Sequence, residues 1–283
     1  QNHRHASGCG HHFRCDLQLL RHDKCSRLEQ RCFRGDGHRA DYGILGVPLR
    51  RGAGSKREVL NVKSELQFTP IDLQVWSRGE VFYYFSKMAP TGYSLTVELD
   101  ISQMRKTLKA SDHKFFPAYL WLVTKLLNEQ MEFKIAEVDG RLGYYNTLTP
   151  LYAAFHDDDK TFSLMWTEYD SSFLGFYEAY IADQIEHGAH HGILAKAGQL
   201  PPPNAYTVSC VPWISFGHFA VHSYENKPYY FPSVEAGKLH KKDGRLYMPL
   251  SITCHHAATD GWHVSRFLEA LQAEANTFEK YLP

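Results

Sequence analysis

The order of elements in the sequence predicts an α/β or α+β domain built around a mixed β-sheet. Strand-like and helical segments alternate from residue 66 onward, and short segments rich in β-branched and aromatic residues are separated by turn residues. Hydrophobic residues make up 43% of the 283 residues, which allows a sizeable core.

Residues 92–102 and 115–130 are the first predicted strand and helix. In 92–102, apolar residues alternate with polar ones, as in a half-buried strand. In 115–130, apolar residues lie nearly all round the helix and Pro117 suits a first turn, so we expect a buried helix. Residues 140–169 are rich in β-branched and aromatic residues and predict two or three strands, with a turn at Asp157–Asp159.

Three more elements follow. Residues 171–188 have aromatic residues at helical spacing between a serine and a glycine, which predicts a helix. Residues 205–216 predict a strand that Pro212 interrupts. Residues 237–254 predict a hairpin, because Asp243–Gly244 suits a tight turn.

The end of that hairpin carries the stretch CHHAATDGWHV, in which two histidines precede Asp260 and Gly261. The preceding apolar side chains all have even numbers: Leu246, Met248, Leu250, Ile252 and Cys254. A strand period of two places His256 on the same inward face and His255 on the other. An inward imidazole at a corner between strand and helix suits a general base, since it accepts a proton near neutral pH.

Other interpretations of the histidines are a core imidazole without function, a metal site or a hydrolase triad. Neighbouring strand residues point to opposite faces and do not readily share one ion, so we predict no metal. A serine hydrolase of this class needs a G-x-S-x-G turn, which the sequence lacks.

The first 65 residues differ from the rest. They hold 13 lysines and arginines against 7 acidic residues, and four of the six cysteines (Cys9, Cys15, Cys25 and Cys32). Their spacing matches no usual zinc motif, and no helix or strand period is present. No methionine precedes Met88. We therefore expect residues 1–65 to be a disordered or non-native extension, and residues 66–283 to be the working domain.

The zero net charge argues against a general nucleic-acid or membrane-surface binder. No apolar run approaches the length of a membrane span, and no charged-then-apolar leader opens the sequence. We expect a cytoplasmic protein.

The HHAATDG stretch resembles the H-H-x-x-x-D-G signature of coenzyme A-dependent acyltransferases. Further segments narrow the resemblance to the chloramphenicol acetyltransferase family, from about Leu66 to the C-terminus: FTPIDLQVWSRGEVFYYF, GYSLTVELDIS, HKFFPAYLWLVTKLLNE, FHDDDKTFS, VSCVPWISF and EAGK. The resemblance implies a two-layer sandwich with helices packed on one face of the mixed sheet. It also implies acetyl transfer from acetyl-CoA to the 3-hydroxyl of chloramphenicol, which inactivates the antibiotic.

The family pattern implies roles for four residues. His256 would remove the hydroxyl proton, and the oxygen would attack the thioester directly. Asp260 would pair with Arg78 and fix the loop that holds the histidine. Ser209 would donate a hydrogen bond to the oxyanion.

The same resemblance implies that Lys114 and Lys238 lie near the coenzyme A phosphates, and that Ser209 also contacts this substrate. Residues that would line the drug pocket are Tyr84, Phe85, Tyr93, Phe162 and Val221. Without the resemblance, each lysine would be taken as a surface residue and each pocket residue as ordinary core. The family pattern also implies a homotrimer with active sites at subunit interfaces.

Three features depart from the family pattern. Thr259 stands where the family has cysteine, and Glu235 where it has threonine. The segment 192–206 lacks the family's phenylalanine before proline, so we expect one wall of the drug pocket to depart from the family pattern. Alternatives are a catalytically silent homologue that binds a drug or dye, and an acetyltransferase for a different hydroxyl acceptor.

Overall fold

The structure is a computed structural model that describes residues 65–222 and 229–283. The expectation for the N-terminal extension concerns residues 1–64, which lie outside this described part, and Glu65, which is exposed.

A large mixed sheet organises the domain, with strand order β2–β10–β8–β7–β5–β6 and β9 paired to β10. Its strands are β2 (Gly92–Asp100), β5 (Thr149–Phe155), β6 (Phe162–Trp166), β7 (Ala205–Val211), β8 (Ser233–Gly237), β9 (His240–Lys242) and β10 (Arg245–His255). The β5–β7 and β7–β8 pairs are parallel and the other pairs antiparallel, so the predicted mixed sheet is confirmed.

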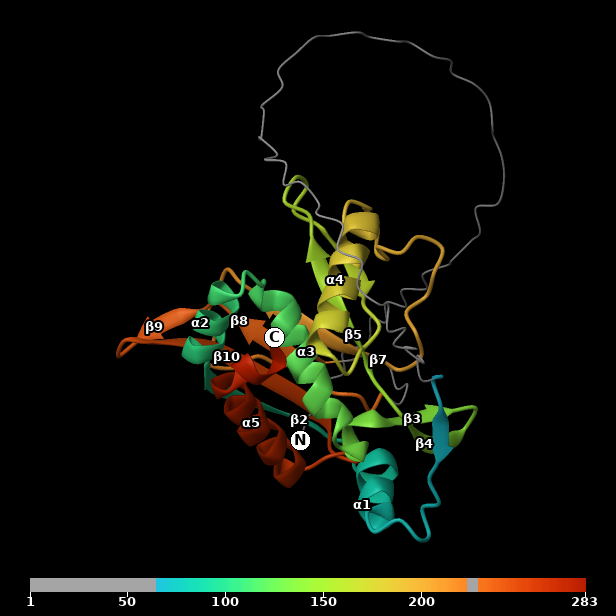
Figure 1. The fold of residues 1–283 in the computed structure, drawn as a ribbon. Helices are drawn as coiled ribbons and strands as arrows, with labels where there is room; N and C mark the ends of the chain where they lie inside the picture. The colour runs from blue at the N-terminus through green and yellow to red at the C-terminus, as the bar shows by residue number, and fades with distance from the viewer. Residues whose placement is uncertain (1–64, 223–228) are drawn as a thin grey trace, which may run out of the picture. The chain divides into compact units, whose positions relative to one another are not determined.

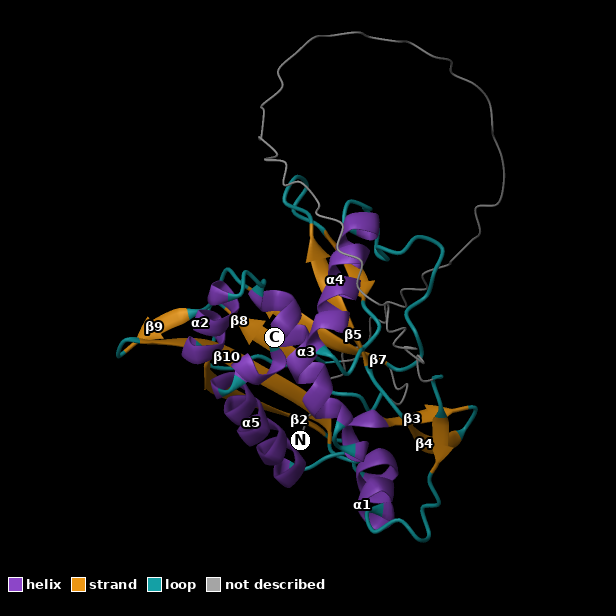
Figure 2. Ribbon diagram, in the orientation of Figure 1, coloured by secondary structure: helices purple, strands orange, loops and turns teal. Residues whose placement is uncertain are grey.

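Four helices pack against one face of this sheet (Figures 1 and 2). They are α2 (Ser102–Ala110), α3 (Phe115–Asn128), α4 (Phe173–His187) and α5 (Gly261–Asn276). Helix α3 is the most buried of the four, as its apolar sequence predicts, and the two-layer α/β fold is confirmed.

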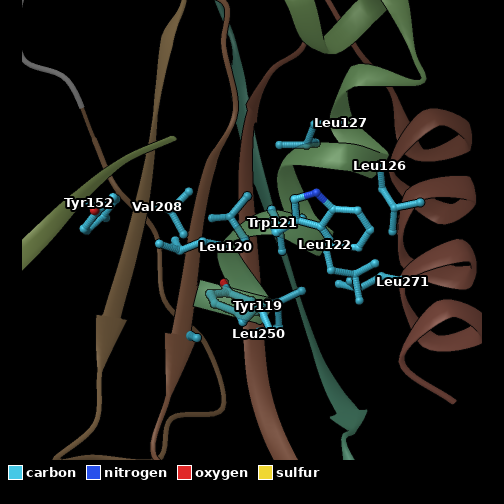
Figure 3. Packing of buried hydrophobic residues seen from close by; sticks show 14 of the residues in the cluster. Tyr119, Leu120, Trp121, Leu122, Leu126, Leu127, Tyr152, Val208, Leu250 and Leu271 are labelled. Atoms are coloured by element: carbon cyan, nitrogen blue, oxygen red, sulfur yellow. The ribbon is translucent and has the colours of Figure 1, made fainter. Parts of the chain in front are cut away.

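The core fills the space between the two layers. Figure 3 shows Leu120 and Trp121 of α3 among side chains of the strands, including Val208 and Leu250. Both β7 and β10 bury their even-numbered apolar residues in this core, so alternate side chains point to the other face of the sheet.

A smaller sheet has the order β1–β4–β3, from β1 (Phe68–Pro70), β3 (Ile135–Val138) and β4 (Arg141–Tyr145). The short helix α1 (Gly79–Tyr83) continues into a π-helical turn over Tyr84–Met88. Two 3₁₀ turns complete the described elements, Met131–Lys134 and Phe278–Tyr281.

Most predicted elements are present within a few residues of their expected bounds. The hairpin turn has positive φ at Asp243 and Gly244, as its sequence requires. Strand β7 ends before Pro212 and is not continued beyond it, since proline has no N–H for the ladder. Helices α1 and α2 and strands β1, β3 and β8 were not predicted. Helix α1 has five residues, α2 lacks a side-chain cap, β1 and β3 have only three and four residues, and β8 depends on two neighbouring strands.

No helix among residues 65–222 and 229–283 is both long and apolar enough to span a bilayer.

Candidate active site

His256 lies directly after β10, at the corner that leads to α5. Its backbone N–H donates to the carbonyl of Thr91, 2.8 Å away, which ties the corner to the start of β2. Its imidazole lies between two aromatic rings. The Phe85 ring stacks on it at 3.9 Å between centroids, and the Tyr93 ring meets it edge-on at 5.2 Å. Two separate elements, the π-helical turn and β2, therefore hold the plane of this imidazole.

The tautomer of His256 follows from its hydrogen bond. Its Nδ1 lies 3.2 Å from the carbonyl oxygen of Thr259, and a carbonyl oxygen only accepts, so Nδ1 carries the proton. In the neutral ring this leaves Nε2 with a free lone pair. That nitrogen is the atom able to accept a proton from a hydroxyl group.

His255 has a different environment. Its Nδ1 accepts the N–H of Ala257 at 3.1 Å, and its ring packs edge-on against Tyr230. Burial and the neighbouring His256 lower its pKa, which favours the neutral ring. These contacts indicate that His255 has a structural role: it holds the backbone of the turn after β10 in place.

The predicted ion pair between Arg78 and Asp260 is present, with Nη1 of Arg78 2.5 Å from Oδ2 of Asp260. Asp260 is also the N-cap of α5 and accepts the N–H of Trp262 at 3.0 Å. Burial raises its pKa, but the hydrogen bond from Arg78 and the interactions with His263 outweigh burial and bring the pKa down to about 2. The carboxylate therefore stays charged and cannot serve as a proton carrier near neutral pH.

His263 is a partner of Asp260 that the sequence analysis missed. Its Nδ1 lies 2.8 Å from Oδ1 of Asp260, and its Nε2 lies 3.7 Å from Glu132. The hydrogen bond from His263 is the largest cause of the lowered pKa of Glu132. A signal was available, because the third residue after an N-cap is where a capping box places a polar side chain.

Thr259 is a second residue whose role was not anticipated. Its carbonyl accepts a hydrogen bond from Nδ1 of His256, and its hydroxyl accepts one from the Tyr93 hydroxyl at 3.2 Å. The threonine found in place of the family cysteine thus links the histidine corner to β2.

Ser209 lies on β7, on the face of the sheet opposite the core. No hydrogen bond or ring contact among residues 65–222 and 229–283 joins it to His256. Phe162 lies on β6, paired with Phe155, and about half of its surface is exposed. Val221 is also exposed, and its N–H lies 3.5 Å from the Thr253 hydroxyl of β10.

The structure thus brings one part of the predicted site together and leaves the rest apart. The histidine group contains His256, Arg78, Asp260, Phe85 and Tyr93, with Tyr84 packed edge-on against Phe85. Among residues 65–222 and 229–283, no hydrogen bond or ring contact joins Ser209, Phe162 and Val221 to this group or to one another.

A surface cavity of about 440 Å³ lies beside α1, lined by Leu73, Gln74, Gly79, Glu80, Tyr83, Tyr84 and Met88. Of the predicted pocket residues it includes Tyr84, and His256 is not part of its lining. This cavity of the single chain is therefore not the predicted drug pocket.

The two predicted coenzyme A lysines are exposed. Lys114 is the N-cap of α3, and Lys238 follows β8 directly. Among the residues that the structure describes, neither ammonium group forms an ion pair, so both charges are available to an anion.

Asp158, Asp159 and His191 bring three possible metal-ligand atoms within 4.8 Å of one another. All three side chains are exposed, and His191 already interacts with both carboxylates, so we assign this group no role in the site.

The chloramphenicol acetyltransferase family model matches residues 66–272. The chain belongs to the chloramphenicol acetyltransferase family. A chloramphenicol acetyltransferase of Clostridium butyricum is 34% identical over 218 residues, which cover 77% of this chain and 99% of the relative. One of Campylobacter coli is 38% identical over 208 residues, covering 73% and 98%.

Solved structures agree with this membership. A chloramphenicol acetyltransferase structure superposes with a TM-score of 0.63 at 25% identity, covering 77% of this chain and all of that one. A dihydrolipoamide acetyltransferase of Azotobacter vinelandii has a TM-score of 0.50 at 19% identity, with 82% of this chain and 100% of that chain covered, and it supports the fold alone.

Proposed function

We propose that this protein transfers an acetyl group from acetyl-CoA to the 3-hydroxyl of chloramphenicol, with His256 as general base. Family membership supports the reaction, and the observation that carries the base assignment is the bond from Nδ1 of His256 to the Thr259 carbonyl. That bond fixes the tautomer and leaves Nε2 free for the proton of the acceptor.

In this mechanism, Nε2 of His256 takes the hydroxyl proton while the acceptor oxygen forms a bond to the acetyl carbonyl carbon. The Ser209 hydroxyl donates a hydrogen bond to the oxygen that becomes negative. His256 then returns its proton to the sulfur as the carbon–sulfur bond breaks, and coenzyme A leaves as the thiol. The proton taken from the acceptor ends on coenzyme A, and no acyl-enzyme forms. Asp260 stays ionised throughout.

Asp260 and Arg78 position the base in this proposal. Asp260 begins α5, and Arg78 directly precedes α1, so their ion pair joins the histidine corner to the segment that carries Phe85. Phe85 in turn stacks on the imidazole. Loss of the pair would shift the base and one of the rings that orient it.

We further propose that the working enzyme is a homotrimer in which His256 of one subunit meets Ser209 of the next. Two observations support this arrangement. No hydrogen bond or ring contact joins the two residues within the described part of one chain. Large apolar side chains at predicted pocket positions and elsewhere on the surface are exposed, including Tyr84, Phe162, Trp213 and Val221. Exposed apolar surface of this kind is typical of an interface.

Lys114 and Lys238 are the proposed contacts for the coenzyme A phosphates, because both are exposed cations without an ion-pair partner in the described chain. Acetyl-CoA is made inside cells, so the proposed reaction places the enzyme in the cytoplasm.

The decisive experiment follows acetyl-CoA-dependent thiol release with and without chloramphenicol. Release that depends on the drug supports the proposed reaction. Release with other hydroxyl acceptors alone would identify a different acceptor, and drug binding without release would identify a silent homologue.

Subunit complementation tests the shared site. His256→Ala and Ser209→Ala chains, each impaired alone, should form mixed trimers by unfolding and refolding together. If each site takes its base and its serine from different subunits, random mixing restores roughly a quarter of the native sites. Activity no higher than the average of the two variants would contradict a shared site.

A further inference from the structure

The face of the large sheet opposite the core carries hydroxyl side chains around the carboxyl group of Glu235. Ser209, Glu235, Ser251 and Thr96 pair in one row across β7, β8, β10 and β2. Ser233 and Thr253 pair in the next row. We call these six residues the hydroxyl face. Paired residues on neighbouring strands project to the same side, so the six side chains share one surface.

Glu235 is the one acidic member of the hydroxyl face, and its side chain is fully buried. One carboxyl oxygen, Oε1, receives a hydrogen bond from the Ser233 hydroxyl. The other, Oε2, is buried and has no hydrogen-bond partner among the residues that the structure describes. No lysine, arginine or histidine in that part of the chain forms an ion pair with it.

A carboxylate in this setting would be a buried charge without a cation, which is strongly unfavourable. The neutral acid avoids that cost. Because Oε1 already accepts a hydrogen bond, Oε2 is the oxygen left to carry the proton, and an O–H at Oε2 is a donor without an acceptor. Burial raises the pKa of Glu235 to about 7, although the bond from Ser233 opposes the rise.

Ser209 is the direct neighbour of Glu235 in the parallel β7–β8 pair. Cβ atoms of such neighbours lie about 5 Å apart, so two donors on this pair can reach one oxygen atom. We propose that Glu235, as a neutral acid, donates a second hydrogen bond beside Ser209 to the acetyl oxygen that becomes negative during transfer. The inference rests on the proposed function and adds a second hydrogen-bond donor to it, the carboxylic acid of Glu235, at a position where the family has threonine.

The proposal demands a dependence on pH. The acid form donates to the developing oxyanion, whereas the carboxylate form would repel it, so turnover falls as Glu235 ionises. The elements around β8 carry four other titratable groups: Cys210 of β7, Cys254 of β10, Tyr119 of α3 and the exposed His218. Burial raises the pKa of Cys210 to about 11 and of Cys254 to about 12, and it holds the pKa of Tyr119 well above its ordinary value. These three groups stay neutral between about pH 5 and 9.

The experiment measures kcat and both KM values from about pH 6 to 9 for the full chain and for three variants. Glu235→Gln keeps a neutral donor of similar size. Glu235→Met keeps the volume and removes the donor. His218→Gln tests the remaining titratable group near the hydroxyl face, whose Nδ1 lies 3.4 Å from the Thr96 hydroxyl.

We expect wild-type kcat to fall about tenfold for each pH unit above the pKa of Glu235, and His218→Gln to show the same fall. Glu235→Gln should have a kcat that does not decline over this range. Glu235→Met should lose roughly 10²-fold in kcat at about pH 6.5, with little change in KM, as expected for a lost oxyanion donor.

Two results would overturn the proposal: a Glu235→Gln variant that declines with pH as the wild type does, or a folded Glu235→Met variant with wild-type kcat. If Glu235→Met does not fold, the pH profile of Glu235→Gln still decides. Failure of the proposed function gives a different result, because no folded variant, wild type included, would then release thiol with chloramphenicol at any pH.

Discussion

The buried carboxyl group of Glu235 predicts how stability depends on pH. In the folded chain the pKa rises from its ordinary value of 4.5 to about 7, because burial disfavours the charged form. Between these two pH values the folded protein keeps a proton that the unfolded chain has released. Stability therefore falls as pH rises through this window, and the full loss is present above about pH 7.

The size of the effect follows from the two pKa values. Each tenfold difference in proton affinity corresponds to about 1.36 kcal/mol, so the change from 4.5 to about 7 corresponds to roughly 3 kcal/mol of lost stability in alkaline solution. Glu235→Gln has no proton to lose and escapes this penalty. The variant should match the wild type near pH 4.5 and become more stable by roughly 3 kcal/mol above pH 7, about 6–12 °C in Tm for a domain of this size.

Thermal unfolding at one protein concentration, from about pH 5 to 8.5, measures the difference. Glu178→Gln is the matched control, because Glu178 is an exposed glutamate on α4 and its replacement should leave the curve parallel to the wild type. A constant gap between Glu235→Gln and the wild type across the pH range would refute the reasoning, since an effect of packing alone does not depend on the proton. A gap that widens with pH would show that Glu235 destabilises the folded chain at neutral pH. Functional groups can carry such a cost in stability.

Further predictions concern the histidine corner and the N-terminal segment. His256→Ala should lower kcat by ~10²–10⁴-fold while isothermal titration still detects binding of both substrates; more than a tenth of wild-type turnover would exclude the general-base role. Asp260→Asn should lower kcat by up to roughly 10²-fold through misplacement of the base, whereas normal kinetics would show that the pair with Arg78 is dispensable. Because the pKa of Asp260 is about 2, the stability that its ionised form contributes should be lost only as pH falls toward 2, and a loss already near pH 5 would contradict this assignment. Deletion of residues 1–65 should leave Tm, assembly and acetyl transfer unchanged, and a lost activity would show that the segment is needed.

The sequence could predict elements whose pattern is local. The even-numbered apolar residues of β10, the turn at Asp243–Gly244 and the apolar helix α3 each carry their own period or turn chemistry, and all three are present. Strand β8 could not be predicted in this way. Its five residues include Ser233, Glu235 and Gly237, which favour strands weakly, and the strand exists because β7 and β10 pair with it on both sides.

The same distinction holds for the site. The inward position of His256 follows from strand period, and the pairing of Arg78 with Asp260 came from the resemblance to the family. The contacts of His263 and of the Thr259 carbonyl could not be read from spacing alone, because they depend on how α5 leaves the corner and where Glu132 lies. A polar residue three positions after an N-cap predicts a contact with the N-cap residue. It does not predict the second contact of His263, which is with Glu132.

Asp260 explains why the corner needs so few residues to fix the base. A single carboxylate caps α5 through the N–H of Trp262, binds Arg78 with one oxygen and faces His263 with the other. It thereby sets where the helix begins, and the turn from His256 to Thr259 must close against that fixed point. The Thr259 carbonyl then accepts a hydrogen bond from Nδ1 of His256. Because the charge of Asp260 is used to hold three partners in place, its effect on the reaction passes through geometry.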